Sequence, residues 1–199
     1  MSKGRLEAFS DGVFAIIITI MVLELKTPHE PSLDALRPLV PTLLSYVLSF
    51  VHVGIYWNNH HHMLQAARHV NGAILWANMH LLFWLSLVPF VTGWMGETYF
   101  AALPVAAYGV VLFLAGIAYY ILARALIAHH GRESTLARAI GDDWKGKVSV
   151  VTYAAAIPFA FVVSWVSGIL YALVAIMWLV PDPRIETTLA EREEANPKE

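Results

Sequence analysis

The sequence contains no cysteine among its 199 residues. This absence excludes a disulfide framework, a zinc site with thiolate ligands, an iron–sulfur cluster and covalently attached c-type haem. Any bound metal would therefore depend on histidine and carboxylate side chains.

Charged residues are scarce at 14% of the chain, whereas 58% of the residues are hydrophobic. Average globular domains have about 25% charged and about 45–50% apolar residues. A soluble monomer of this composition would expose too much apolar surface, and the mean hydropathy of +0.58 agrees. The formal net charge of −2 means that basic residues are not in excess, as they usually are in nucleic-acid-binding proteins. We therefore expect no nucleic-acid partner. The composition predicts an all-α, polytopic membrane protein.

Motifs of common enzymes are also missing. The chain has no G-x-S-x-G, P-loop, Rossmann or H-E-x-x-H pattern. Its only paired carboxylates, Asp142-Asp143 and those of the C-terminal tail, are expected to be solvated. The TVGYG signature of potassium-selective carbonyl filters is absent as well. We therefore expect neither an enzyme nor a filter of that kind.

Long apolar runs are present, and a spanning helix needs about 20 mostly apolar residues. The last run, Val148 to Val180, would be roughly 50 Å long as one helix, too long for one span. We divide it at the small, polar residues 164–168 (SWVSG) and expect Pro158 to kink its first part. Proline near residue 89 is expected to break the third span. The six predicted spans are 6–25, 36–63, 71–94, 101–126, 146–164 and 167–181.

The basic residues orient these spans. With the N-terminus inside, only Lys26 and Arg37 fall outside, a strong positive-inside bias. We therefore expect a multi-pass protein of the plasma membrane with cytoplasmic N- and C-termini, and a charged cytoplasmic tail over residues 184–199. The basic residues on the inner side are Lys3, Arg5, Arg68, Arg124, Arg132, Arg138, Lys145, Lys147, Arg184, Arg192 and Lys198.

Asp11 is unusual because it lies inside the first span. A charge near mid-helix costs about 2.5–3.5 kcal/mol on insertion scales, unless Asp11 merely caps a helix that begins at Gly12. At 100° per residue, Ile16, Thr19 and Leu23 share one stripe, and Asp11 points about 140° away from Ile16. The stripe either faces lipid, with Asp11 turned into the bundle, or lines a central axis, with Asp11 behind it. The angles leave both arrangements open.

Partners for Asp11 occur at matching depth in the next two spans. Trp57 and His61 share a helix face, and Asn78 lies several residues into the third span. A layer of Asp11, Trp57, a histidine and Asn78 can be fully hydrogen-bonded. Because three consecutive histidines point about 100° apart, residues 60–62 are not expected to bind one metal. His129-His130 is interpreted as part of the loop over residues 127–147.

The run of residues 5–11 (RLEAFSD) resembles the transmembrane protein 175 family, which comprises the endosomal/lysosomal potassium channel of animals and smaller bacterial relatives. Further similarity follows in order: residues 16–25 (IIITIMVLEL), Tyr56-Trp57 with His60-His61, and Asn78 with residues 89–92 (PFVT). The similarity covers about the first 95 residues well and the remainder by hydropathy only.

The resemblance implies six helices per repeat and, since this chain has one repeat, a homotetramer. Residues 1–183 are then one channel domain whose first helix lines a potassium-permeable pore, with no cofactor besides permeant K⁺. It implies a constriction at Ile16, a threonine layer at Thr19 and an apolar ring at Leu23. Glu24 is a weaker candidate at the outer mouth. The motif is implied to be held behind the pore by a network whose members are Arg5, Phe9, Ser10, Asp11, Trp57, His61 and Asn78, with the choice between His60 and His61 left open.

Two other functions remain open from the residues. A proton-linked transporter or proton channel would use Asp11 and the histidines as a relay. A membrane-embedded binding or haem protein is the third class.

Overall fold

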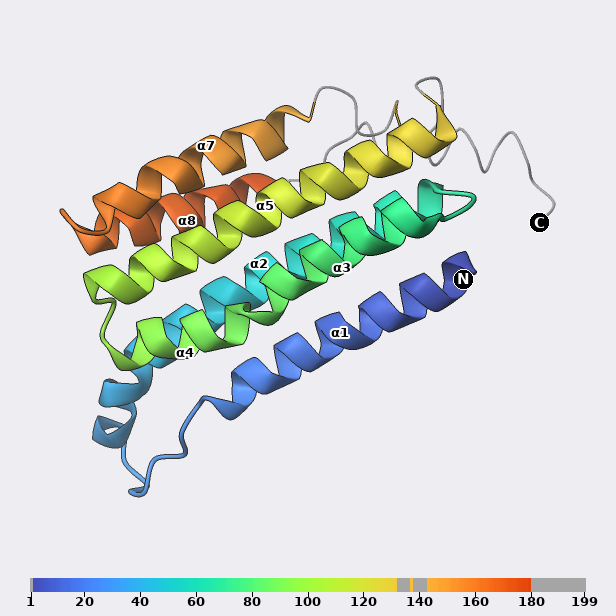
Figure 1. Cartoon of the computed structure of the whole chain (residues 1–199). Coiled ribbons are helices and arrows are strands. Elements are labelled where there is room, and N and C mark those ends of the chain that lie inside the picture. The colour runs from blue at the N-terminus through green and yellow to red at the C-terminus, as the bar shows by residue number, and fades with distance from the viewer. Residues whose placement is uncertain (1, 132–136, 138–142, 180–199) are drawn as a thin grey trace.

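The computed structural model describes residues 2–131, 137 and 143–179. These residues are helical throughout, apart from turns and loops, and no strand occurs among them. Figure 1 shows α1 (Lys3–Leu23) on one flank and α7 (Trp144–Phe159) with α8 (Ser164–Leu179) on the opposite flank. α5 (Ala102–His130) lies between them and packs on α3, α4, α7 and α8. The all-helical prediction is confirmed, and the predicted tail over residues 184–199 lies outside the described residues.

Proline determines where several helices begin. η1 (Asp34–Leu39) contains Pro38, and α2 (Val40–Ala66) carries a proline in its first turn. The third predicted span is two helices, α3 (Gly72–Ser86) and α4 (Val88–Glu97), with Pro89 in the first turn of α4. Proline lacks a backbone N–H and is therefore tolerated where that donor has no helical partner.

Four helical segments are long and apolar enough to cross a membrane: Lys3–Leu23, Asp34–Ala66, Gly72–Glu97 and Ala102–His130. Among the described residues, α8 is a shorter apolar helix. α7 and α8 have 16 residues each, about 24 Å at 1.5 Å per residue.

The turn between α7 and α8 lies at residues 160–163, earlier than the small-residue cluster suggested. Pro158 sits in the last turn of α7, and Phe161 N already donates to the Pro158 carbonyl. Ser167 then lies inside α8, where its hydroxyl donates to the Ala156 carbonyl at 2.7 Å. Ser167 thus joins the two helices instead of separating them.

A buried polar cluster ties α2, α4 and α5 together. Thr92 Oγ1 donates to Ser49 Oγ at 2.7 Å, and Ser49 Oγ donates to the Tyr108 hydroxyl at 3.1 Å. Next to this cluster on α5, Gly109 leaves room for α8, because a Cβ there would clash with the Tyr171 hydroxyl. That hydroxyl donates to the Val105 carbonyl at 3.1 Å. Such directional contacts set the register between helices that share a largely apolar core.

Candidate functional site

The candidate site is α1, whose two sides have different surroundings. Five of its side chains are buried against the remainder of the chain, and α1 packs on α2, α3 and α4. Their spacing of three or four residues places them on one side of the helix. They are Leu6, Ser10, Phe14, Ile17 and Met21.

Ile16, Thr19 and Leu23 lie on the opposite side of α1. Ile16 is 57% exposed and Leu23 is 79% exposed in the single chain. The Thr19 hydroxyl donates to the Ile16 carbonyl at 3.0 Å, so it needs no partner from another helix. This stripe, Ile16–Thr19–Leu23, contributes little to packing within one subunit.

A buried chain of hydrogen bonds fixes the packed side of α1. Asn78 Nδ2 donates to Ser10 Oγ at 3.0 Å, and Ser10 Oγ donates to the Leu6 carbonyl at 2.8 Å. The remaining Asn78 atom, Oδ1, is an acceptor, so His60 Nε2 donates to it across 2.7 Å. All three side chains are almost fully buried. These bonds join buried side chains of α1, α2 and α3, and therefore the rotation of α1 against α2 and α3 is specified.

The histidine in this chain of bonds is His60, one of the two that the sequence left open. His61 is exposed and stacks on Trp57, with ring centroids 5.8 Å apart and planes at 25°. Neighbouring helical residues point about 100° apart, so only one of the two histidines reaches the interior. His60 is that residue, and its ring also lies 5.5 Å from the Phe14 ring.

Asp11 belongs to a separate contact. Its Oδ1 accepts a hydrogen bond from Trp57 Nε1 at 3.0 Å, on the exposed edge of the α1–α2 interface. Because α1 begins at Lys3, Asp11 lies well inside the helix and is not its N-cap. The expected single layer is therefore two contacts: Asp11 with Trp57, and Ser10 with Asn78 and His60.

The remaining candidate residues lie at the surface of the chain. Arg5 and Phe9 are exposed, and Arg5 forms no hydrogen bond or ion pair with the described part of the chain. Glu24 follows the end of α1, and its carboxylate lies beside Gly93, where an added Cβ would be 3.3 Å from Oε2. Nearby, the exposed Lys26 pairs with Glu97, whose hydrogen bond and negative charge raise the pKa of the lysine.

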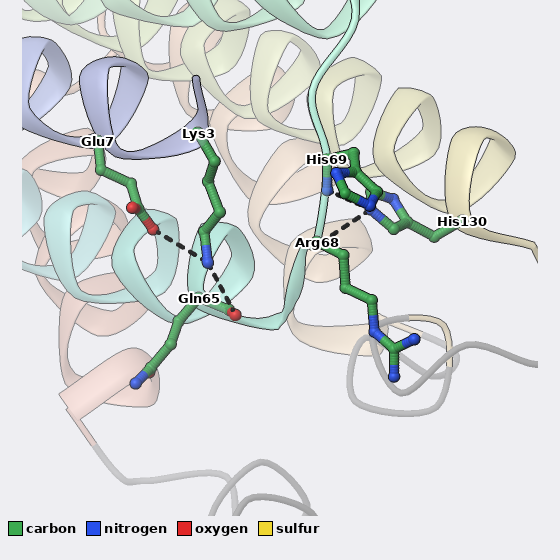
Figure 2. A network of polar contacts seen from close by, with 6 residues as sticks. All are labelled: Lys3, Glu7, Gln65, Arg68, His69 and His130. Carbon is green, nitrogen blue, oxygen red and sulfur yellow. Dashed lines mark hydrogen bonds and ion pairs between the residues drawn. The ribbon is translucent and has the colours of Figure 1, made fainter. Parts of the chain in front are cut away.

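The prediction that residues 129–130 lie in a loop is wrong, because α5 continues to His130. The helix ends at Gly131, whose φ of 91° is readily adopted only by glycine. His130 accepts hydrogen bonds from the backbone N–H groups of Arg68 and His69 (Figure 2). The sequence had no local signal for this contact, since its donors are backbone groups from a distant turn.

Within residues 2–131, 137 and 143–179, no three histidine or acidic side chains are arranged to hold a metal ion. The interior of the site contains hydrogen-bonded polar groups and apolar side chains.

Comparison with known proteins gives a consistent result. A family model described as "Endosomal/lysosomal potassium channel TMEM175" matches residues 5–89. A potassium channel of Chryseobacterium sp. (strain P1-3) is 53% identical over 191 residues, covering 96% of this chain and 100% of that protein. The endosomal/lysosomal proton channel TMEM175 of Gallus gallus is 38% identical over 73 residues, covering 31% of this chain and 15% of its own length.

The fold is also that of a solved channel. The crystal structure of a lysosomal potassium-selective channel TMEM175 homolog from Chamaesiphon minutus has a TM-score of 0.78. It is 28% identical in sequence and covers 89% of this chain and 96% of its own.

Proposed function

Because this chain belongs to the TMEM175 family, we propose that it forms a homotetrameric, potassium-permeable cation channel in the plasma membrane, with cytoplasmic termini. Four copies of α1 surround the pore. The potassium channels among its relatives support the permeant ion, and the long apolar helices support the membrane location.

The observation that carries the proposal is the unpacked stripe on α1. Ile16, Thr19 and Leu23 lie opposite the side that the chain buries. One helix cannot enclose a path for ions, whereas four identical stripes around an axis can. The hydrogen bonds of Ser10 and Asp11 hold α1 in the rotation that turns this stripe away from its own subunit.

Ile16 forms the constriction in this proposal. Four isoleucine side chains give a narrow hydrophobic ring that can close by loss of water and that an ion passes only after shedding part of its hydration shell. Potassium sheds water more readily than sodium, which favours potassium modestly. Thr19 and Leu23 extend the lining, and Glu24 raises the local cation concentration at the outer mouth.

Ile16→Asn tests the constriction in proteoliposomes loaded with K⁺ or Na⁺. A polar ring holds water, so we expect K⁺ flux to rise several-fold or the preference for K⁺ over Na⁺ to fall. Val22→Asn is the matched control, since Val22 is also exposed on α1 and points about 120° away from Ile16. Equal effects of both variants, or none from Ile16→Asn, would remove Ile16 from the constriction.

A proton channel is the second candidate function. It is favoured by the buried hydrogen-bonded chain through His60, Asn78 and Ser10, and by the proton channel among the relatives. It predicts flux that follows the pH gradient in the absence of K⁺ and is lost in Asp11→Asn or His60→Gln while tetramers still assemble. Flux that follows the K⁺ gradient at equal pH supports the first candidate.

A further inference from the structure

Three segments distant in sequence meet at the end of the bundle where α1 begins (Figure 2). Lys3 Nζ donates to the Gln65 carbonyl at 3.2 Å and lies 3.5 Å from Glu7 Oε1. This contact fastens α1 to the last turn of α2. The turn that follows, residues 67–71, then contacts the last turn of α5.

His130 makes that second contact through Nε2, while its Nδ1 bonds within α5. Its Nε2 lies 3.0 Å from Arg68 N and 3.2 Å from His69 N, and both of these backbone groups are donors. Its Nδ1 lies 2.9 Å from the Leu126 carbonyl, which can only accept. The ring is therefore neutral, with its single proton on Nδ1 and the Nε2 lone pair shared by two N–H groups.

A second neutral histidine supports the same turn. His129 Nδ1 lies 3.2 Å from Asn71 Nδ2, which donates, so this nitrogen is an acceptor as well. The other end of the Asn71 side chain, Oδ1, caps α3 by accepting from Ile74 N at 3.0 Å. Both histidines thus bind the turn through lone pairs that a proton would occupy.

We propose that His130 is a proton-operated clamp that holds the α2–α3 turn against the end of α5 and releases it when the ring becomes protonated. A proton on Nε2 would point directly at two N–H donors, and neither of those contacts survives as a hydrogen bond. Histidine is the side chain that ordinarily changes charge between about pH 5 and pH 8. The clamp is closed at high pH and opens as the pH falls.

The charged and titratable groups around the clamp come from the α2–α3 turn, from α5 and from α1. Arg68 and His69 contact it through backbone N–H groups of the turn, His129 lies on its own helix with a ring centroid 5.1 Å away, and Lys3 of α1 belongs to the neighbouring contact with Gln65. Glu7 is the acid of the same network and is paired with Lys3. The loss of the Nε2 lone pair on protonation is therefore what opens the clamp.

Release of the turn from α5 affects α1 through Gln65. This residue lies in the last turn of α2, just before the α2–α3 turn, and its carbonyl accepts a hydrogen bond from Lys3. A turn freed from α5 removes the support of that carbonyl. The inference does not require conduction of any ion, so its test is independent of the proposed function.

Hydrogen–deuterium exchange of the Arg68 and His69 amides, measured on the full chain in lipid nanodiscs, tests the clamp. We expect their protection factors to fall about tenfold or more between pH 8 and pH 5.5 in the unmodified protein. His130→Gln retains an acceptor but cannot take up a proton, so its protection should stay constant. His69→Gln is the matched control: it removes the neighbouring ring, keeps the backbone donor, and should retain the pH response.

A second measurement needs no variant. Nitrogen-15 NMR of labelled histidine should give His130 the tautomer protonated on Nδ1 at pH 8. Protonation on Nε2 at that pH would overturn the clamp, even if His130→Gln failed to assemble. An unchanged protection factor in the unmodified protein, or an equal loss in His130→Gln, would also overturn it.

Discussion

The two sides of α1 differ in how much of the chain packs against them. The packed side, with Ser10 and Phe14, finds apolar contacts and hydrogen bonds inside its own chain. The open side, with Ile16 and Leu23, packs on little of its own chain and stays exposed. Substitutions on the packed side should therefore act on the stability of each subunit, whereas those on the open side should act on assembly and conduction. This separation makes the proposed pore testable by comparing matched positions on one helix.

The largest expected difference is between Phe14→Ala and Leu23→Ala. Phe14 is 1% exposed and packs against His60, so truncation leaves a cavity and should lower the free energy of unfolding by about 3–4 kcal/mol. Leu23 is 79% exposed, and its truncation should leave subunit stability nearly unchanged. Unfolding in mixed micelles with increasing denaturing detergent measures both. Equal losses would mean that the open side is packed as well.

Asn78→Ala should have the next largest effect. It leaves the buried His60 Nε2–H without an acceptor and removes the donor to Ser10, which should cost about 2 kcal/mol. Asn58→Ala is the control, because Asn58 is an exposed asparagine of α2. The same unfolding assay applies. A cost as small as that of the control would show that the buried chain of bonds does not anchor α1.

Trp57→Phe should have the smallest effect, because it removes one hydrogen bond at the edge of the packed side and keeps an aromatic ring. We expect a loss of about 1 kcal/mol. A double-mutant cycle with Asp11→Asn isolates this contact, and Trp76→Phe, at a 78% exposed tryptophan, serves as control. Additive effects of the two substitutions would place Asp11 outside any stabilising contact with α2.

Much of the fold was predictable because its signals are local. Apolar run length indicated the helices, and Pro89 marked the break between α3 and α4. The 3.6-residue period placed Ile16, Thr19 and Leu23 on one stripe before any packing was known. The same period indicated that Trp57 and His61 share a face, and their rings stack.

Other features depended on how the helices pack. The choice between His60 and His61 requires the rotation of α2 about its axis, which neighbouring helices set. The polar residues 129–130 suggested a loop, but backbone donors of the α2–α3 turn satisfy His130 and the helix continues. Ser167 suggested a turn, but its hydroxyl is satisfied by α7.

Hydrophobicity and helical geometry act within a few residues, so the linear order of amino acids was enough to define an all-helical membrane chain with an apolar stripe on its first helix. A hydrogen bond between distant helices requires matching depth and rotation of both partners. Those two quantities arise only when all the helices pack against one another, which is why the pairing of Asn78 with His60, the separate contact of Asp11 and the clamp at His130 emerged from the folded arrangement.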